Sequence, residues 1–163
     1  MPDLKELVVG KLRDRFADEF ESSNEYRGEL TVIVKKSAIR SVCQFLRDDA
    51  ELRFDSLRDV CGVDYYRPED RFEVVYNLYS IPQNFRLRIK VRVDESDLHV
   101  DSVTPVFSTA DWEERETYDM YGIIFDGHPD LRRIYMPEDF EHFPLRKDFP
   151  LMGIPGSLAL PRK

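Results

Sequence analysis

Residues 72–93 read FEVVYNLYSIPQNFRLRIKVRV, and this stretch decides the fold. Apolar side chains fall on alternate positions on both sides of a short break, at Phe72, Val74, Tyr76 and Leu78 and again at Leu87, Ile89, Val91 and Val93. Strict alternation places one set of side chains on one face of a strand. The break at residues 81–84 contains a proline and an asparagine, which are typical turn residues. Two alternating runs joined by such a turn predict an antiparallel β-hairpin.

The polar face of the second run carries a stripe of bases, Arg86, Arg88, Lys90 and Arg92. Such a stripe indicates either a surface that binds an acidic partner or a phosphate, or a solvated outer face that positive charge protects. Because Glu73 on the neighbouring strand offers cross-strand pairing, we favour the solvated face.

The segments before the hairpin alternate between helical and extended patterns. Apolar residues recur at helical spacing over residues 3–20, which predicts an amphipathic helix. The β-branched run Leu30–Val34 predicts a strand. Ser37 is a candidate cap for a second helix that ends near Asp48 and Asp49. The apolar stripe of that helix comprises Ile39, Val42, Cys43 and Leu46.

From residue 53 onward the period changes from helical to two, and after the hairpin Leu98–Val103 predicts a further strand. Helix, strand and helix followed by a meander predict an α+β fold, with a mixed or antiparallel sheet and helices packed on one face. The domain is expected to cover residues 1–125 and to include an ionic helix at residues 109–121. Residues 126–163, here called the strap, are expected to form an extended C-terminal docking segment.

The ionic helix at residues 109–121 has Thr109 as its candidate cap and Gly122 as its C-terminal stop. Asp111, Arg115 and Asp119 are four residues apart, so we expect Arg115 to lie between two carboxylates on one helical face.

The glutamates of this helix allow two interpretations. Glu113, Glu114 or Glu116 would be a proton-handling carboxylate if neighbouring acids raised its pKa. Alternatively, Arg115 neutralises its neighbours and lowers their pKa, which favours permanent ion pairs over acid–base chemistry. We favour the ion pairs.

Six of the ten prolines lie between residues 129 and 161. Proline fixes φ and removes an amide donor, so this stretch is expected to be extended or turning. Aromatic and aliphatic side chains supply anchors, at Tyr135, Met136, Phe140, Phe143, Leu145, Phe149, Leu151 and Met152, and bases supply directional contacts, at Arg132, Arg133, Arg146 and Lys147. The strap either folds back on its own domain or runs across a neighbouring protein.

Metal chemistry has little support in the sequence. His128 and His142 have acids nearby at Asp126, Glu138, Asp139 and Glu141, but their spacing matches no common ligand motif. We favour hydrogen bonding for both histidines. Two cysteines are too few for a four-thiolate cluster or a cysteine-rich zinc site, so Cys43 and Cys61 are expected to be free thiols.

Composition narrows the classes further. A chain of 163 residues suits one domain, and no run of eighteen apolar residues could span a bilayer. The acidic N-terminus lacks the pattern of a signal peptide, which points to the cytosol or to the cytosolic face of a larger assembly. The net charge is −8, while residues 127–163 hold six bases and five acids. A negative body argues against non-specific nucleic-acid binding.

Two blocks near the C-terminus resemble a known family. The first comprises Glu114-Arg115-Glu116, Asp119-Met120-Tyr121, His128, Arg132 and Ile134-Tyr135, and the second is Pro144-Leu145-Arg146-Lys147-Asp148-Phe149-Pro150-Leu151. In residue type, spacing and order they are similar to the 30 kDa-type subunit of proton-translocating NADH–quinone oxidoreductase, or respiratory complex I. Val60–Tyr65 resembles a weaker landmark of the same family.

The resemblance implies a peripheral-arm subunit that carries no cofactor and has no active site of its own, with FMN and iron–sulfur clusters held by other subunits. Its implied partners are the large subunit related to nickel–iron hydrogenase and the small subunit with the terminal iron–sulfur cluster. It would sit at the cytoplasmic face of the bacterial inner membrane, touching the membrane only through the complex and binding no nucleic acid.

The resemblance also implies which residues set interface geometry and assembly. They are Glu114, Arg115, Glu116, Asp119, His128, Arg132, Pro144, Leu145, Arg146, Lys147, Asp148 and Phe149. Three alternatives stay open: the equivalent subunit of an energy-converting hydrogenase or another related membrane complex, a free-standing acid–base or metal hydrolase, and an adaptor unrelated to respiration.

Overall fold

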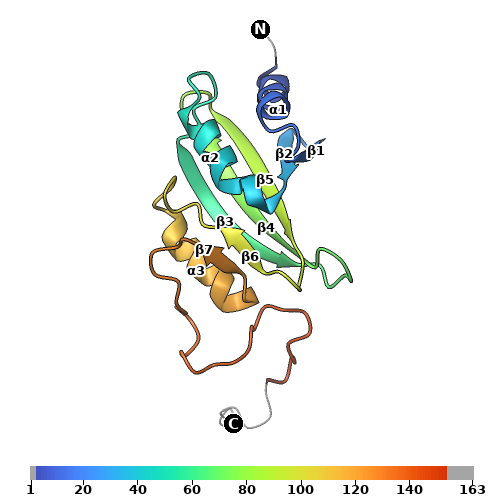
Figure 1. The fold of residues 1–163 in the computed structure, drawn as a ribbon, viewed down its shortest axis with the longest axis vertical. Coiled ribbons are helices and arrows are strands. Elements are labelled where there is room, and N and C mark those ends of the chain that lie inside the picture. The colour runs from blue at the N-terminus through green and yellow to red at the C-terminus, as the bar shows by residue number, and fades with distance from the viewer. Residues whose placement is uncertain (1–2, 154–163) are drawn as a thin grey trace.

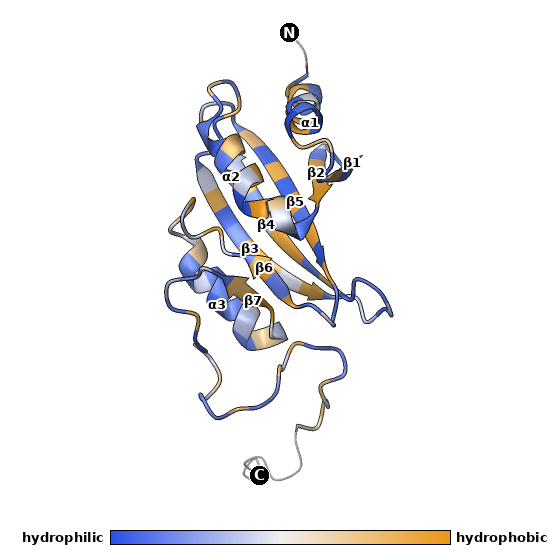
Figure 2. Cartoon of the chain, in the orientation of Figure 1, coloured by the Kyte–Doolittle hydropathy of each residue, from blue (hydrophilic) through white to orange (hydrophobic). Residues whose placement is uncertain are grey.

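The hairpin predicted from the alternating residues forms the centre of the main sheet. β4 (Phe72–Ser80) and β5 (Phe85–Val93) pair antiparallel along their whole length. In this computed structural model, which describes residues 3–153, the alternation is visible as bands along both strands (Figure 2). One set of side chains is buried in the core. The opposite face, which carries Asn77, Arg88 and Lys90, is here called the outer face.

Five strands complete the sheet in the order β1-β2-β5-β4-β3. β1 (Phe20–Tyr26) and β2 (Glu29–Val34) form one antiparallel pair, and β3 (Ser56–Asp64) pairs antiparallel with β4. β2 and β5 run parallel, so the sheet is mixed. The predicted α+β class with a mixed sheet is therefore confirmed. β1 was not predicted, because its mostly polar sequence shows no strand pattern.

The first two helices differ from their predicted bounds. α1 (Leu4–Arg15) begins where the Asp3 side chain accepts a hydrogen bond from the Lys5 amide. The prediction of a helix over residues 3–20 was too long, because Phe20 already belongs to β1. α2 (Ile39–Asp48) follows a 3₁₀ turn, η1 (Lys36–Ala38), so Ser37 lies inside that turn and does not cap the helix.

The core lies between α2 and the inner face of the sheet. Figure 1 shows α2 crossing that face, with α1 beside the β1–β2 end. The predicted stripe of α2 is fully buried, at Ile39, Val42, Cys43 and Leu46, against sheet residues such as Val32, Tyr76 and Ile89. Removing this apolar surface from water stabilises the fold by about 25 cal/mol per Å².

The strand predicted at residues 98–103 exists but does not extend the meander. β6 (His99–Asp101) pairs in parallel with β7 (Ile124–Asp126) in a separate two-stranded sheet. α3 (Ala110–Tyr121) connects the two strands. Thr109 stands at its N-terminus without a side-chain hydrogen bond, whereas Gly122 ends it at φ 80°, as predicted.

α3 lies along β3, the edge strand of the main sheet, and so covers that edge. Gly62 on β3 makes the close approach possible. A Cβ atom at this position would lie 2.6 Å from Cδ2 of Tyr121, a distance that no side chain can occupy.

The first residue of the predicted strap, Asp126, belongs to β7. The remaining described residues of the strap, 127–153, contain no helix or strand and pass beneath α3 in Figure 1. The remainder of the predicted docking segment, residues 154–163, lies outside the described residues. Among residues 3–153, no helix has the length and apolar character needed to cross a membrane.

Candidate functional site: the junction of helix α3 and the strap

Glu114 anchors α3 to the loop that follows β6. Its side chain is fully buried, and its two oxygens accept hydrogen bonds from the Val103 amide and the Ser102 hydroxyl, both at 2.7 Å. Burial raises the pKa of Glu114 to about 7, although these hydrogen bonds and the charge of Arg40 oppose the rise. These two bonds hold α3 against the loop.

Glu113 has a similarly perturbed pKa. Burial, reinforced by the Asp59 carboxylate, raises its pKa to about 7, and among the described residues its Oε2 atom has no hydrogen-bond partner. The expectation that Arg115 would lower the pKa of these acids was therefore wrong. At both glutamates, burial outweighs the hydrogen bonds that oppose the rise in pKa.

These raised pKa values predict the pH dependence of stability. Between the ordinary pKa of 4.5 and about 7, the folded state binds more protons than the unfolded state at both glutamates. Their contribution therefore makes the free energy of unfolding fall as the pH rises through this window. We expect Glu114→Gln to flatten the fall, because Gln accepts the Val103 amide bond, donates to Ser102 and does not titrate. Urea unfolding at pH 5.5 and at pH 7.5 measures the slope.

Glu6→Gln is the matched control, since Glu6 is an exposed helical glutamate on α1 and contributes to neither raised pKa. It should leave the slope unchanged. Equal slopes for wild type and Glu114→Gln would contradict a raised pKa at Glu114.

Arg115 does not lie between Asp111 and Asp119, contrary to the prediction. Its guanidinium stacks on the Trp112 ring at 4.6 Å, and its Nε donates to the Arg132 carbonyl at 3.3 Å. Its nearest carboxylate belongs to Asp130, at 3.9 Å. The side chain therefore binds the start of the strap, and Trp112, Arg132 and Asp130 take the place of the two expected carboxylates.

Asp119 is fully buried and forms the tightest connection between α3 and the strap. One carboxylate oxygen accepts three consecutive backbone N–H groups, from Ile134 at 3.0 Å, Tyr135 at 2.7 Å and Met136 at 3.0 Å. The other oxygen accepts from Arg133 at 2.6 Å. Burial alone would raise the pKa of Asp119, but these donors outweigh it and hold the pKa below its ordinary value. Asp119 thus fixes the path of the strap.

His128 orients the chain just after β7. Its ring is fully buried, its Nδ1 accepts from the Asp130 amide at 3.0 Å, and its Nε2 lies 3.0 Å from the Asp111 carbonyl. An acceptor at Nδ1 requires the proton on Nε2, which donates to that carbonyl. Both nitrogens are therefore engaged in hydrogen bonds, as we predicted for this residue.

The second of the two family blocks, residues 144–151 and here called the second signature block, binds the end of α3. Arg146 donates to the Tyr121 carbonyl at 2.7 Å, and its guanidinium stacks on Phe72 at 5.1 Å and on Phe143 at 4.6 Å. The Leu145 amide donates to the Met120 carbonyl at 3.2 Å. Both bonds satisfy carbonyl groups at the helix C-terminus that otherwise lack partners.

The second block also contacts a buried ion pair of the domain. Arg71 and Asp64 are both almost fully buried and are joined through two N–H···O bonds of 3.1 and 2.9 Å. Asp64 also accepts from the Lys147 amide at 2.8 Å, and Arg71 reaches Asp148 at 3.0 Å. Burial would raise the pKa of Asp64, but the bonds from Arg71, Lys147 and Tyr66 hold the pKa at about 2.

Sequence reasoning missed Asp64 and Arg71 as site residues. The available signal was an acid at the end of one apolar strand and a base directly before the next. Neither residue lies in the two signature blocks, although Asp64 falls within the weaker landmark at Val60–Tyr65.

The twelve predicted residues divide into two groups. Those that link the domain, α3 and the strap to one another through side chain or backbone are Glu114, Arg115, Asp119, His128, Arg132, Leu145, Arg146, Lys147 and Asp148. Of the other three, Glu116 is exposed, Pro144 is half-buried, and Phe149 packs within the strap beside Phe140 and His142.

Among residues 3–153, no group of three or more His, Cys, Asp or Glu side chains is arranged to hold a metal ion. His142 lies against the Phe140 ring at 5.7 Å, apart from His128 and its partners. Cys43 and Cys61 are free thiols, as predicted, and burial raises the pKa of both.

Comparison with known proteins places this junction in a family context. The model of the family described as "Respiratory-chain NADH dehydrogenase, 30 Kd subunit" matches residues 32–155, which contain both signature blocks. The chain belongs to this family. Its function is therefore that of a 30 kDa-type subunit of NADH–quinone oxidoreductase.

Individual relatives support the same family membership. Its counterpart in Geotalea uraniireducens, the NADH-quinone oxidoreductase subunit designated C, is 52% identical over 155 residues, covering 94% of this chain and 93% of the relative. The protein of the same name from Brucella ovis is 54% identical over 146 residues, covering 90% and 72%.

Solved structures share the fold. A trypsin-resistant fragment of Nqo5, residues 1–134, superposes with a TM-score of 0.66 at 32% identity and covers 77% of this chain and 98% of the fragment. A chain of the membrane-bound sulfane sulfur reductase, an archaeal respiratory membrane complex, superposes with a TM-score of 0.76 over 92% of this chain and 88% of its own length. At 22% identity the second likeness concerns the fold alone.

Proposed function

We propose that this 30 kDa-type subunit braces the quinone-site subunits of the peripheral arm and carries no redox group or active site of its own. Its partners would be the large subunit related to nickel–iron hydrogenase and the small subunit with the terminal iron–sulfur cluster. It would occupy the cytoplasmic face of the bacterial inner membrane as a peripheral component. Electrons then pass from NADH through FMN and iron–sulfur clusters to quinone in the neighbouring subunits.

The observation that carries the proposal is the contrast between buried and exposed side chains along the signature blocks. Asp119 of α3 and Asp64 of the domain bind backbone N–H groups of the strap, and Arg146 of the strap binds the Tyr121 carbonyl at the end of α3. The same backbone then presents apolar side chains to solvent, with Tyr135 61% and Leu145 51% exposed.

Such an arrangement suits docking to a neighbour. Exposed large apolar side chains on a rigid backbone mark protein interaction surfaces, and a backbone that is already ordered loses less entropy on binding. The proposed docking segment is thus residues 126–163, with the domain at residues 1–125 as its support.

We expect Arg146→Ala and Arg115→Ala to lower the amount of assembled complex much more than the turnover per assembled complex. Each substitution loosens the strap or its start, because it removes a hydrogen bond and a cation–π contact. Native gel electrophoresis of solubilised membranes gives the amount of complex, and NADH–quinone activity is divided by that amount.

A second variant separates docking from folding. Tyr135→Ser should lower assembly while leaving the melting temperature of the isolated chain unchanged, since the Tyr135 side chain is exposed. Lys5→Ala, which removes an exposed pair with Glu25 at the other end of the domain, is the control. Normal assembly with lost turnover would overturn the bracing role.

A further inference from the structure

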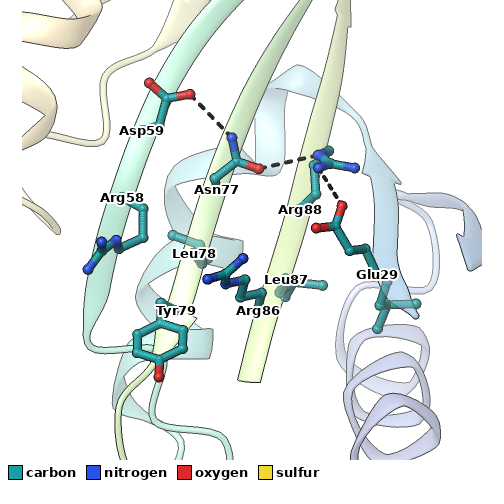
Figure 3. Close-up of a pocket in the computed structure, with 10 residues that line it drawn as sticks. Glu29, Arg58, Asp59, Asn77, Leu78, Tyr79, Arg86, Leu87 and Arg88 are labelled. Atoms are coloured by element: carbon teal, nitrogen blue, oxygen red, sulfur yellow. Dashed lines mark hydrogen bonds and ion pairs between the residues drawn. The ribbon is translucent and has the colours of Figure 1, made fainter. Parts of the chain in front are cut away.

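The outer face of the sheet carries a hollow of about 490 Å³ that the α3–strap junction does not touch. Arg58 of β3, Tyr79 and Asn77 of β4, Arg86 and Arg88 of β5 and Glu29 of β2 lie around it (Figure 3). None of its lining residues comes from α3 or the strap, so the hollow is independent of the site described above.

In one row of side chains across this face, every charged group has a partner within the chain. Arg88 donates to Glu29 at 2.8 Å and to Asn77 at 3.3 Å, and Asn77 donates to Asp59 at 3.3 Å (Figure 3). Farther along β5, Lys90 pairs with Glu73 at 2.9 Å, as the sequence predicted. Arg88 and Lys90 are therefore paired within the chain, and their charges are less available to an outside ligand.

The next row, Arg58, Tyr79 and Arg86, is here called the open row because its two arginines have no acidic partner among the described residues. Tyr79 stands opposite Arg86, and the irregular pairing between Leu57 and Asp59 places Arg58 on the same face, 5.9 Å from the Tyr79 ring. Both arginines are exposed, and among residues 3–153 neither has a carboxylate within salt-bridge distance. Two free guanidinium groups thus flank one aromatic ring.

We propose that this open row binds an acidic segment of another polypeptide, with one carboxylate on Arg58 and a second on Arg86. The two arginines stand on strands separated by β4, so their attachment points are about 10 Å apart. Arginine binds carboxylates through two parallel N–H···O bonds, which gives this pair of sites directional specificity.

The surrounding charges favour separated carboxylates over a continuous polyanion. Glu29 and Asp59 border the same hollow, and the chain as a whole carries −8. A nucleic acid brings one phosphate at every step and would be repelled by these acids. A segment with single acids spaced along it avoids them and places an uncharged stretch over Tyr79.

The test uses the full chain and a labelled peptide of four Pro-Pro-Glu repeats. A polyproline II helix has three residues per turn and rises about 3.1 Å per residue, so its glutamates lie on one side about 9 Å apart. We expect fluorescence anisotropy to show binding at ~50 mM salt that weakens at ~300 mM. A peptide of four Pro-Pro-Gln repeats should not bind.

Substitution assigns the binding to the open row. Arg58→Gln combined with Arg86→Gln should weaken binding about tenfold. Arg92→Gln is the matched control, because Arg92 lies on the same strand and is exposed but pairs with Glu21 at 3.5 Å. It should change the affinity less than about twofold. Melting temperatures of all variants should match the wild type, since each side chain is exposed.

Four results would overturn the proposal, and the first three concern the peptides and the double variant. They are no binding of the glutamate peptide, equal binding of the glutamine peptide, and wild-type affinity in the double variant. Equal binding of a labelled oligothymidylate that the double variant also loses would make the row a general anion site, which likewise contradicts an acidic polypeptide as its specific ligand.

Discussion

Replacing Asp119 with alanine is expected to lower the free energy of unfolding by about 3–5 kcal/mol, the usual loss when one partner of a buried pair is removed. The Arg133 side chain is only 10% exposed and would keep its charge without its carboxylate. The amides of Ile134, Tyr135 and Met136 would lose their acceptor at the same time. Urea unfolding of the isolated chain measures the loss.

Two variants calibrate this result. Asp119→Asn keeps one acceptor oxygen and should lose less stability than Asp119→Ala. Asp97→Ala breaks an exposed pair with Lys36 and should leave the free energy of unfolding nearly unchanged, because solvent screens such a pair. If Asp119→Ala lost no more than this control, the carboxylate would not be the link between α3 and the strap.

Replacing Arg71 with alanine is expected to cause a loss of similar size, about 3–5 kcal/mol, because it strands a buried carboxylate. The Asp64 side chain is 1% exposed and takes its two guanidinium bonds from Arg71. The change also removes the partner of Asp148 and so frees the strap. Urea unfolding measures the loss, and trypsin cleavage after Arg146 and Lys147 should become faster.

A double-mutant cycle with Asp148→Asn separates the two effects. Asp148 is partly exposed, so its coupling with Arg71 should be about 1 kcal/mol or less, and the remaining loss then belongs to Asp64. Arg27→Ala removes an exposed arginine stacked on Tyr26 in the β1–β2 turn and serves as the control. Unchanged cleavage in Arg71→Ala would separate the strap from this ion pair.

The regular elements were predictable wherever burial imposed a period. The β4–β5 hairpin and the stripe of α2 followed directly from alternating or helical apolar residues. β1 was missed because only Phe20 and Ser23 of its polar sequence are half-buried and the rest is exposed, so burial imposed no alternation on it. α1 was overestimated because Phe16 and Phe20 continue the apolar pattern of the helix after its backbone has ended.

The site was predictable in its location but not in its contacts. Charge, aromatics and proline identified the segment, yet the partners of Asp119 are mostly backbone N–H groups, which leave no mark in a sequence. Helical spacing assigned Arg115 to Asp111 and Asp119. The strap supplied better-placed partners to both Arg115 and Asp119, and tertiary contacts then prevailed over local ones.

The parallel seam between β2 and β5 bears on how quickly the chain reaches its native state. The β1–β2 and β4–β5 hairpins close over short turns, whereas Leu30 meets Leu87 only after α2, β3 and β4 have been passed along the chain. Contacts so distant in sequence form late, because loop closure must precede them. Until the seam closes, the backbone edge of β5 stays open to other chains. For a newly synthesised subunit, the interval before the seam closes is therefore its period of greatest exposure to aggregation.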